Sequence, residues 1–528
     1  MPRISGPSLV RNGDNGPIDQ SAARAEILSR AQALIALATE HGIQGSTFAA
    51  FETRLVGEVF ALARVVLGLF LIESEARVSA ALPARLERGG RTFRRAPAQW
   101  RNLTSWFGVL RYRRTYLREV STSAARGFHP LDAELGLLAD RLSPNLLSIA
   151  VRLATRTSFA DVRVLLGWFL PTPPSTEVIE SALLGYGRHT QEWFVTAPAP
   201  ENDGDVLVIQ IDSKGVPTAT DEELRRRRGK RKRKAKAPSP RHRGRGRRER
   251  WTKKPRRKKG DKAKNAKMGT MVVIYTLRQQ AYGSLLLGPI NKRYYASFAP
   301  KRHAVEIARR EATKRGFPPG TRKTIQVLTD GDNDLDRYIA ELFPGAIHTI
   351  DVMHVIEKLW DAASSVHREG TPEAHSWVAK QKDALYGGKA ASIVVELDRQ
   401  LARIARTGPG NKYRREKLEE VRSYIAKRVS RMNYKALADR DLELGTGPVE
   451  GAIKNLMYKR MDHGGMRWIK ERAEALLQLR CIDANGDWES FVARVHAKTQ
   501  AEQISSARRV RIQHRQAAPL PTVLAEAA

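Results

Sequence analysis

The sequence has a single cysteine, Cys481, among its 528 residues. One cysteine cannot form an internal disulfide or a cysteine-based zinc cluster, so small domains held by such cross-links are excluded. Acidic residues are also few, because 56 Asp and Glu stand against 92 Lys and Arg and leave a formal net charge of +36. An excess of this size predicts an anionic partner and binding that weakens with salt.

Long apolar runs are the third feature of which the sequence has little. The longest, residues 59–72, is shorter than the roughly 18 residues that a membrane-spanning helix needs, and it contains Arg64. The first ten residues, MPRISGPSLV, lack the apolar core of a signal peptide. We therefore expect no membrane partner, and a reducing cytoplasm as the compartment.

The length predicts two or three domains, of which residues 21–200 form the first. Residues 1–20 are polar and are predicted to be disordered, whereas apolar residues recur at helical spacing over 21–40 and 48–86. Residues 107–120 alternate well enough for a short hairpin or strand. The first domain is therefore predicted to be mainly α-helical.

Within this domain, residues 158–187 predict two helices on either side of the sequence PTPP. Ser175 or Thr176 can cap the second helix, because a hydroxyl accepts the free amide hydrogens of the first turn. The pattern fits a DNA-binding helix-turn-helix, and it fits an ordinary pair of packed helices equally well.

From residue 205 the composition changes to dense β-branched runs that are typical of buried strands. Residues 205–351 thus predict a mixed α/β sheet with flanking helices. Residues 352–444 predict an all-α insertion, and residues 445–497 return to the same domain. A disordered tail is expected over 498–528. The five expected strands are residues 205–212, 267–277, 282–298, 324–331 and 346–351.

A basic insert, residues 225–267, lies between the first two expected strands. It holds 25 Lys or Arg against two acids and is predicted to be disordered when free, because its charges repel one another. We interpret it as an arm that binds nucleic acid without reading sequence, with one tryptophan available to stack on a base. A solubilising loop or a nuclear-import-like run are the alternatives. The residues expected to contact DNA here are Arg225, Arg226, Arg227, Arg228, Lys230, Arg231, Lys232, Arg233, Lys234 and Trp251.

Three acids occupy positions that suit catalysis. Asp212 and Asp330 each follow a strand, and Glu450 lies just inside a helix after a Gly/Pro break. Adjacent strands would place the two aspartates side by side, and the helix would bring in the glutamate. Packed carboxylates repel one another unless cations bind, and two Mg²⁺ ions held by hard oxygen ligands suit phosphoryl transfer. From spacing alone, an aspartate after a strand is more often a turn residue.

Other polar residues lie near these acids. Lys454 is one helical turn past Glu450, and Arg460 follows two turns later; both could meet DNA phosphate, although a Glu–Lys pair at this spacing is usually a surface pair. Asp351 and His354 can share a helix face, as a metal pair or, in the reading we favour, through a structural hydrogen bond. Asp332, Asp334 and Asp336 compete with Asp330, which is preferred because it adjoins the strand end.

At these residues the sequence resembles a bacterial insertion-sequence transposase of the DDE class, and most of all the ISKra4 family. The resembling blocks are VIQIDSKGVP, VLTDGDNDL, FPGAIHTIDVMHVIEKLW and GTGPVEGAIKNLMYKRMDHGGMRWIKERAEALLQLR. The resemblance implies an RNase H-like catalytic domain interrupted by the all-α insertion. It also implies that Asp212, Asp330 and Glu450 are the metal-binding triad and that Asp351 and His354 are supporting residues. Members of the family often carry a cysteine-based zinc element near RYRRTYLREV, where this chain has no cysteine.

By the same resemblance, two Mg²⁺ or Mn²⁺ ions would serve DNA strand cleavage, after which the freed 3′-hydroxyl would join target DNA. The expected partners are double-stranded DNA, as terminal inverted repeats and target, and further copies of the chain in a homo-oligomer. No small-molecule cofactor is expected, and the compartment would be the bacterial cytoplasm, close to the nucleoid. Three alternatives stay open: a catalytically inactive DNA-binding derivative, a structure-selective nuclease of the same fold, and a basic RNA-binding protein.

Overall fold

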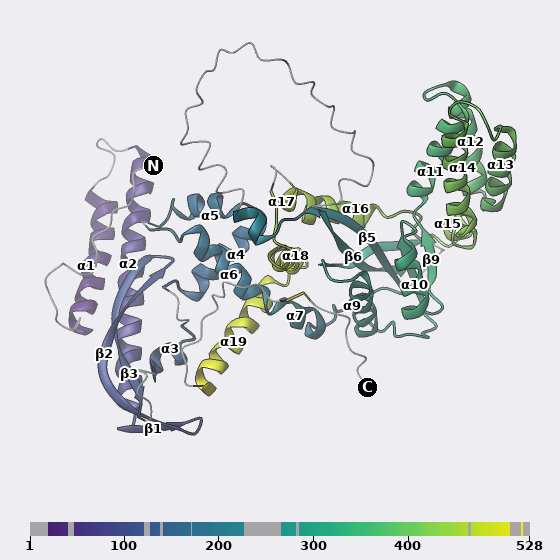
Figure 1. The fold of residues 1–528 in the computed structure, drawn as a ribbon. Helices are drawn as coiled ribbons and strands as arrows, with labels where there is room; N and C mark the ends of the chain where they lie inside the picture. Colours follow the sequence, from purple (N-terminus) through teal and green to yellow (C-terminus); the bar gives the residue numbers. More distant parts are fainter. Residues whose placement is uncertain are drawn as a thin grey trace, which may run out of the picture. The chain divides into compact units, whose positions relative to one another are not determined.

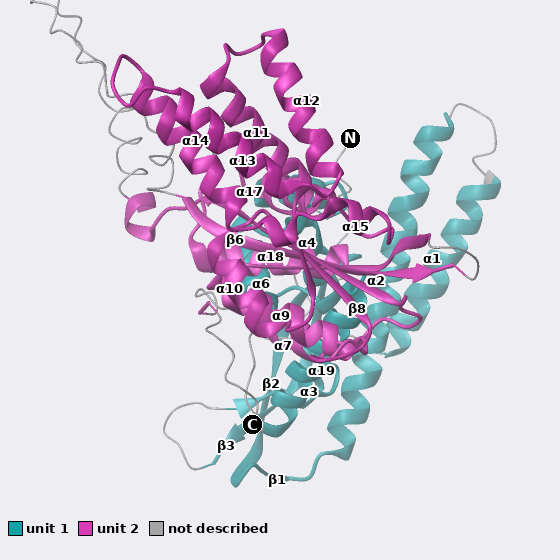
Figure 2. Cartoon of the chain, turned by 90° about the vertical axis from the view of Figure 1, so that its right-hand side faces the viewer, with its two compact units in different colours: residues 1–189, 486–518 teal, residues 190–485, 519–528 magenta. Residues whose placement is uncertain are grey.

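The computed structural model describes residues 20–40, 47–120, 127–137, 141–170, 172–225, 266–280, 285–462, 466–506 and 519–520. The chain forms two compact units (Figure 2). Unit 1 comprises residues 1–189 and 486–518, and unit 2 comprises residues 190–485 and 519–528. The chain thus returns to unit 1 after residue 485, which corrects the prediction that residues 445–497 belong together. Each unit is described by itself.

Unit 2 is built on a five-stranded mixed sheet with the order β7–β6–β5–β8–β9 (Figure 1). β6 is antiparallel to both β5 and β7, whereas β8 runs parallel to β5 and β9 parallel to β8. All five predicted strands are confirmed. The dense apolar runs made them predictable from the sequence. The strands are β5 (Val206–Pro217), β6 (Ala266–Gln279), β7 (Leu286–Ser297), β8 (Thr324–Thr329) and β9 (Ile347–Ile350).

Helices cover both faces of this sheet. α9 (Lys301–Lys314) and α10 (Asn333–Leu342) pack on the face to which Leu207, Ile209 and Ile211 of β5 contribute. Side chains alternate along a strand, so Gln210 and Asp212 point to the opposite face. That second face is covered by a short helix, a π-helical turn and a longer helix, which contact β5, β6 and β7. These elements are α16 (Gly447–Ala452), η3 (Ile453–Tyr458) and α18 (Lys470–Ala484); the short α17 (Lys459–Met461) and α7 (Thr190–Thr196) also belong to unit 2.

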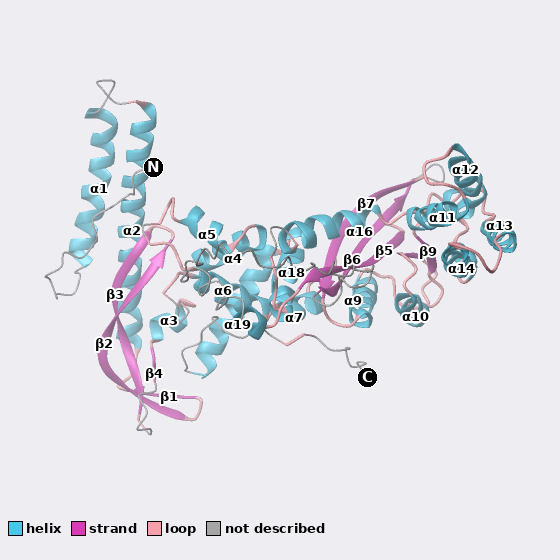
Figure 3. Ribbon diagram, turned by 45° about the horizontal axis from the view of Figure 1, so that its top comes forward, coloured by secondary structure: helices cyan, strands magenta, loops and turns pink. Residues whose placement is uncertain are grey.

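The all-α insertion is confirmed between β9 and α16. Its helices gather beyond β9, at one end of the sheet (Figure 3). They pack on a core of their own that includes Leu359, Ile393, Leu418 and Ile425, all fully buried. The helices are α11 (Val352–Val366), α12 (Pro372–Tyr386), α13 (Ala390–Arg403), α14 (Asn411–Ala426), η2 (Val429–Arg431) and α15 (Tyr434–Ala438).

Unit 1 combines helices with a four-stranded antiparallel sheet of order β1–β2–β3–β4. The described part of this region is mainly helical, as predicted, but its sheet has four strands where the sequence predicts one hairpin or strand. The strands are β1 (Arg85–Arg88), β2 (Arg91–Ser105), β3 (Gly108–Glu119) and β4 (Gly127–Phe128). The helices are α1 (Gln20–Glu40), α2 (Phe48–Ala81), α3 (Pro130–Glu134), α4 (Pro144–Arg156), α5 (Phe159–Leu166), α6 (Thr176–Gly187) and α19 (Trp488–Ser506).

Helix α2 corrects the prediction that no apolar run is long enough to span a membrane. By length and composition it passes that test, as the core helix of a soluble protein also does. About 22 % of its most apolar window is buried, and the helix packs against α1 and β3. Val56, Val59, Val66 and Phe70 remain exposed along it.

Two further predictions are refined by the helices of unit 1. α19 extends to Ser506, so the predicted disordered tail is wrong for residues 498–506. Ser175 caps α6 as predicted, and its side chain accepts a hydrogen bond from Val178 N. Residues 167–175 connect α5 to α6, and this connection is longer than the turn of about three or four residues in a helix-turn-helix. The helix-turn-helix therefore stays a prediction.

Candidate active site at the ends of two parallel strands

Asp212 and Asp330 lie at matching positions on adjacent parallel strands. The last pair in the register of β5 and β8 is Ile211 with Thr329. Asp330 directly follows the end of β8, as predicted, whereas Asp212 lies within β5, which continues to Pro217 and so extends past the strand end expected from the sequence. Neighbouring strands lie about 4.8 Å apart, so the register brings the two carboxylates to one edge of the sheet. Both are half-buried. Asp212 shares its face of the sheet with Gln210, which is the face that α16 covers.

The pKa of Asp212 is affected by the charges of the other two acids. Burial is the largest cause that raises the pKa of Asp212, from 3.8 to about 6, and the charges of Asp330 and Glu450 raise it further. The backbone N–H of Ser213 donates to Asp212 Oδ1 at 2.5 Å and opposes the shift, as does the charge of Lys214. Asp330 and Glu450 therefore both lie within electrostatic range of Asp212.

Glu450 is brought to this place by the start of α16. Gln210, fully buried on β5, accepts a hydrogen bond from Val449 N at 3.1 Å and donates to Gly445 O at 3.3 Å. The side chain thus binds both sides of the Gly/Pro break and fixes the helix start to the strand that carries Asp212. The Glu450 side chain is exposed.

Thr446 links Glu450 to Asp351. The Thr446 hydroxyl lies 2.8 Å from Asp351 Oδ2 and 3.4 Å from Glu450 Oε1. Asp351 is 3 % exposed and caps α11, where its Oδ1 accepts from Met353 N at 3.1 Å. These are the contacts of a positioning residue. His354 instead lies 3.7 Å from Glu357 and packs edge-on to Tyr424.

The loop after Asp330 is held by the all-α insertion. Gly331 has a φ of 84°, which only glycine adopts freely, and a Cβ there would lie 2.8 Å from both Arg428 Nε and Tyr424 Oη. Tyr424 donates to Asp330 O at 2.7 Å, and Arg428 Nη2 donates to Gly331 O at 2.5 Å. Arg428 also pairs with Asp336, which removes that acid from competition with Asp330.

Neighbouring acids have partners of their own. Asp332 caps α10 and pairs with Lys301, and its pKa is lowered because hydrogen bonds to that lysine and to backbone amides outweigh the opposing effect of burial. Asp334 is exposed on the first turn of α10. The structure therefore distinguishes Asp330 from the three aspartates that blur its assignment in the sequence.

The residues predicted to bind DNA differ in their exposure to solvent. Arg225 and Lys454 are exposed, whereas Arg460 is 3 % exposed and stacks on Trp468, with its guanidinium 5.0 Å from the ring centre. Lys267, predicted at the end of the basic insert, lies in β6. The remaining predicted contacts lie outside the described residues: Arg226, Arg227, Arg228, Lys230, Arg231, Lys232, Arg233, Lys234 and Trp251.

The donor set suits a hard cation, but the present spacing does not. Three carboxylates offer the oxygen ligands that Mg²⁺ prefers. The pKa of Asp212 is raised by burial first and then by the charges of Asp330 and Glu450, and a bound cation would oppose both effects. Within the described ranges, no group of three or more His, Cys, Asp or Glu side chains is arranged to hold an ion. Charges act over about 8–10 Å, whereas Mg²⁺ needs oxygens at about 2.1 Å, so a cation would have to draw the side chains together.

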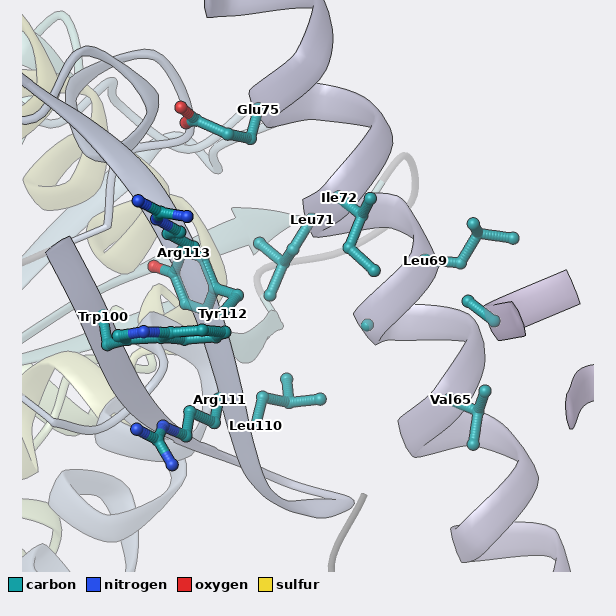
Figure 4. Close-up of a pocket in the computed structure, with 12 residues that line it drawn as sticks. Val65, Leu69, Leu71, Ile72, Glu75, Trp100, Leu110, Arg111, Tyr112 and Arg113 are labelled. Carbon is teal, nitrogen blue, oxygen red and sulfur yellow. The ribbon is translucent and has the colours of Figure 1, made fainter. Parts of the chain in front are cut away.

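A cavity of about 150 Å³ lies elsewhere, in unit 1 (Figure 4). α2 lines it with Leu69, Ile72 and Glu75, and the β2–β3 hairpin lines it with Trp100 and Tyr112. Its wall is mostly apolar, and none of the three carboxylates lines it. The cavity is therefore separate from the acidic site.

Sequence reasoning missed the residues that position the carboxylates. Gln210 left a signal, because it is the one polar residue in the run VLVIQI. Tyr424 and Arg428 left none, since their role depends on how α14 meets the loop after β8. In comparisons with known proteins, no family model matches the sequence, and no curated protein matches it either.

Proposed function

We propose that the chain is a transposase that cuts DNA at the ends of an insertion sequence and joins it to target DNA, with unit 2 as an RNase H-like catalytic domain. The observation that carries the proposal is the gathering of Asp212, Asp330 and Glu450 at one edge of a mixed sheet. Three antiparallel strands followed by two parallel ones, with one acid on the first strand and one directly after the fourth, support the assignment of the domain. Its partners would be duplex DNA and further copies of the chain, in the cytoplasm.

The chemistry of the proposal follows from the three carboxylates. Asp212, Asp330 and Glu450 would hold two Mg²⁺ or Mn²⁺ ions, which when bound supply activation of the attacking oxygen and stabilisation of the leaving oxygen. Gln210 and Thr446 position the helix that carries Glu450. Lys454, exposed one turn further along, would offer a cation to the DNA phosphates.

The test is strand cleavage and strand transfer with Mg²⁺ on a duplex that carries the element end. Glu450→Gln should abolish both reactions while DNA binding persists, because the amide keeps the shape but loses the charge that a metal needs. Glu416→Gln, on an exposed glutamate of the insertion, is the matched control and should leave both reactions unchanged. If Glu450→Gln is as active as the native protein, Glu450 has no catalytic role and the proposed chemistry is wrong.

A second candidate is a DNA-binding protein without catalysis, and the spacing of the carboxylates favours it. If they cannot close around a cation, Mg²⁺ would neither stabilise the protein nor support nicking. A nuclease of the same fold would cut branched DNA but give no joined product. The assay separates these three outcomes, because cleavage and joining are scored apart.

A further inference from the structure

The antiparallel sheet of unit 1 carries an unusual concentration of arginine. Residues 85–119 contain ten arginines against two glutamates, a net charge of +8. Four of the ten have partners within the protein: Arg101 and Arg114 are buried with Asp132, Arg91 pairs with Glu119, and Arg95 donates to the backbone. The exposed ones need another explanation.

Three exposed arginines lie side by side across three strands. In the register, Arg85 of β1 is opposite Arg94 of β2, and Arg94 is opposite Arg118 of β3. Directly opposed residues share a face of the sheet, so the three side chains form one row, which we call the arginine row. In the described part of the chain, none of the three has a carboxylate within ion-pair distance. Like charges directly opposite one another destabilise a sheet, so the arginine row does not contribute to the stability of the fold.

The other end of the same hairpin is also cationic. Arg111 and Arg113 are exposed on β3; Arg111 stacks on Trp100, with its guanidinium 4.8 Å from the ring centre, and Arg113 is opposite that tryptophan in the register. Figure 4 shows the two arginines on either side of the ring. Positive charge therefore continues along the hairpin rather than ending at the row.

A purely protective role does not account for the row. Exposed charges on edge strands do prevent edge-to-edge pairing. The middle residue, Arg94, however, lies on β2, which is paired on both sides. An aligned row on an inner strand repels no approaching edge, and so it indicates an anionic ligand that spans the strands.

We propose that the arginine row binds the phosphate backbone of duplex DNA, so that unit 1 holds DNA through its sheet. Two strand spacings of about 4.8 Å give the row a length of roughly 10 Å. Phosphates of one DNA strand are spaced about 3.4 Å along the helix axis, so the row can neutralise two or three of them. Guanidinium groups suit this task, because they match phosphate geometry with two parallel hydrogen bonds. The choice of DNA as the ligand rests on the proposed function.

The first test uses the chain's cysteine content. Cys481 is fully buried and is the only cysteine, so a cysteine introduced on the surface is the only accessible thiol. Arg94→Cys, labelled with a photoactivatable aryl azide, should cross-link to a duplex. Arg54→Cys, on an exposed face of α2 in the same unit, is the matched control and should not cross-link above background. Equal cross-linking at both positions, or none at residue 94, overturns the proposal.

The second test is the salt dependence of duplex binding by the full chain. Arg94→Ala with Arg118→Ala should reduce the slope of log affinity against log salt by about 1.8, since each neutralised phosphate contributes about 0.9. The affinity lost between 50 and 200 mM salt then falls by roughly tenfold. Arg94→Lys with Arg118→Lys should keep most of the slope, because both positive charges remain. Arg54→Ala with Arg77→Ala, the control pair, should not change the slope. A slope that is unchanged in the row variant, or reduced as much in the control, contradicts the proposal.

Neither test needs catalysis, so the two proposals fail separately. Cross-linking that persists in Glu450→Gln supports the row whatever the outcome of the strand-transfer assay. Normal strand transfer with no cross-link at residue 94 refutes the row alone. Double-stranded RNA and anionic phospholipid vesicles are then added as competitors. If either reduces the cross-linking as well as unlabelled DNA does, the assignment of duplex DNA as the ligand is wrong.

Discussion

Asp212→Asn should stabilise the metal-free protein. The native carboxylate is half-buried near two other acids, so its ionisation costs free energy in the folded state that the unfolded chain does not incur. The amide keeps an oxygen that can accept the hydrogen bond from Ser213 N. The substitution therefore removes the charge and leaves the local geometry in place.

The magnitude follows from the shift of the Asp212 pKa from 3.8 to about 6. About two pKa units correspond to roughly 3 kcal/mol at full effect. We discount this to about 2 kcal/mol, because the side chain keeps some contact with solvent. For unit 2, with about 300 residues, the expected rise in Tm is roughly 3 °C.

The pH dependence has a fixed sign. The folded state keeps its proton to a higher pH than the unfolded state does, so the native protein loses stability relative to the variant as pH rises from about 4 to about 6. Above pH 6 the difference is constant, and below about pH 4 it vanishes, because Asp212 is then protonated in both states.

The assay is thermal unfolding in chelator at pH 4, 6 and 7.5. Asp205→Asn, on the exposed residue that precedes β5, is the control and should change stability by less than about 0.5 kcal/mol at every pH, because the amide oxygen can still accept from Gln279 N. A Tm difference between native protein and Asp212→Asn that is absent at pH 7.5, or that does not grow between pH 4 and 6, would refute the account of the acidic site.

Three further outcomes are expected. Mg²⁺ at millimolar concentration should raise the Tm of the native protein but not that of Glu450→Gln, and a rise in both would mean that the ion binds elsewhere. Gln210→Met should cost about 1–3 kcal/mol, because it leaves the buried Val449 N–H without its acceptor; it should also lower strand transfer more than DNA binding, and an equal loss of both would indicate general unfolding. Gly331→Ala should cost about 1–3 kcal/mol by denaturant unfolding, because the backbone is left-handed and the Cβ meets Arg428 and Tyr424; an unchanged midpoint would show that the loop rearranges freely.

Much of unit 2 can be predicted from the sequence because its patterns are local. Asp212 and Asp330 can be selected because each directly follows an apolar run, although the strand ends at that point only in β8, and β5 continues to Pro217. The parallel register that aligns the two acids cannot be predicted this way, since it depends on pairing between segments more than 100 residues apart.

Unit 1 was harder to predict for a physical reason. β2 and β3 are rich in arginine and bury both of their faces only in part, so neither strand shows a clean apolar alternation. Arg101 and Arg114 lie in the interior only because Asp132 of α3 meets them there. Such burial of charge is decided by tertiary pairing and leaves no periodic pattern in the sequence.

The return of α19 to unit 1 ties the beginning of the chain to its end. Trp488 Nε1 donates to Ser148 Oγ, and the Tyr186 hydroxyl lies 2.8 Å from His496 Nε2. α19 therefore completes a unit whose other described elements are synthesised before it. Unit 1 therefore cannot be completed during translation until residues 190–485 of unit 2 have been synthesised. A copy shortened by a frameshift or nonsense mutation anywhere in unit 2 before Glu450 would lack both that carboxylate and the closing helix. In such fragments, the part that precedes the break is itself left unfinished.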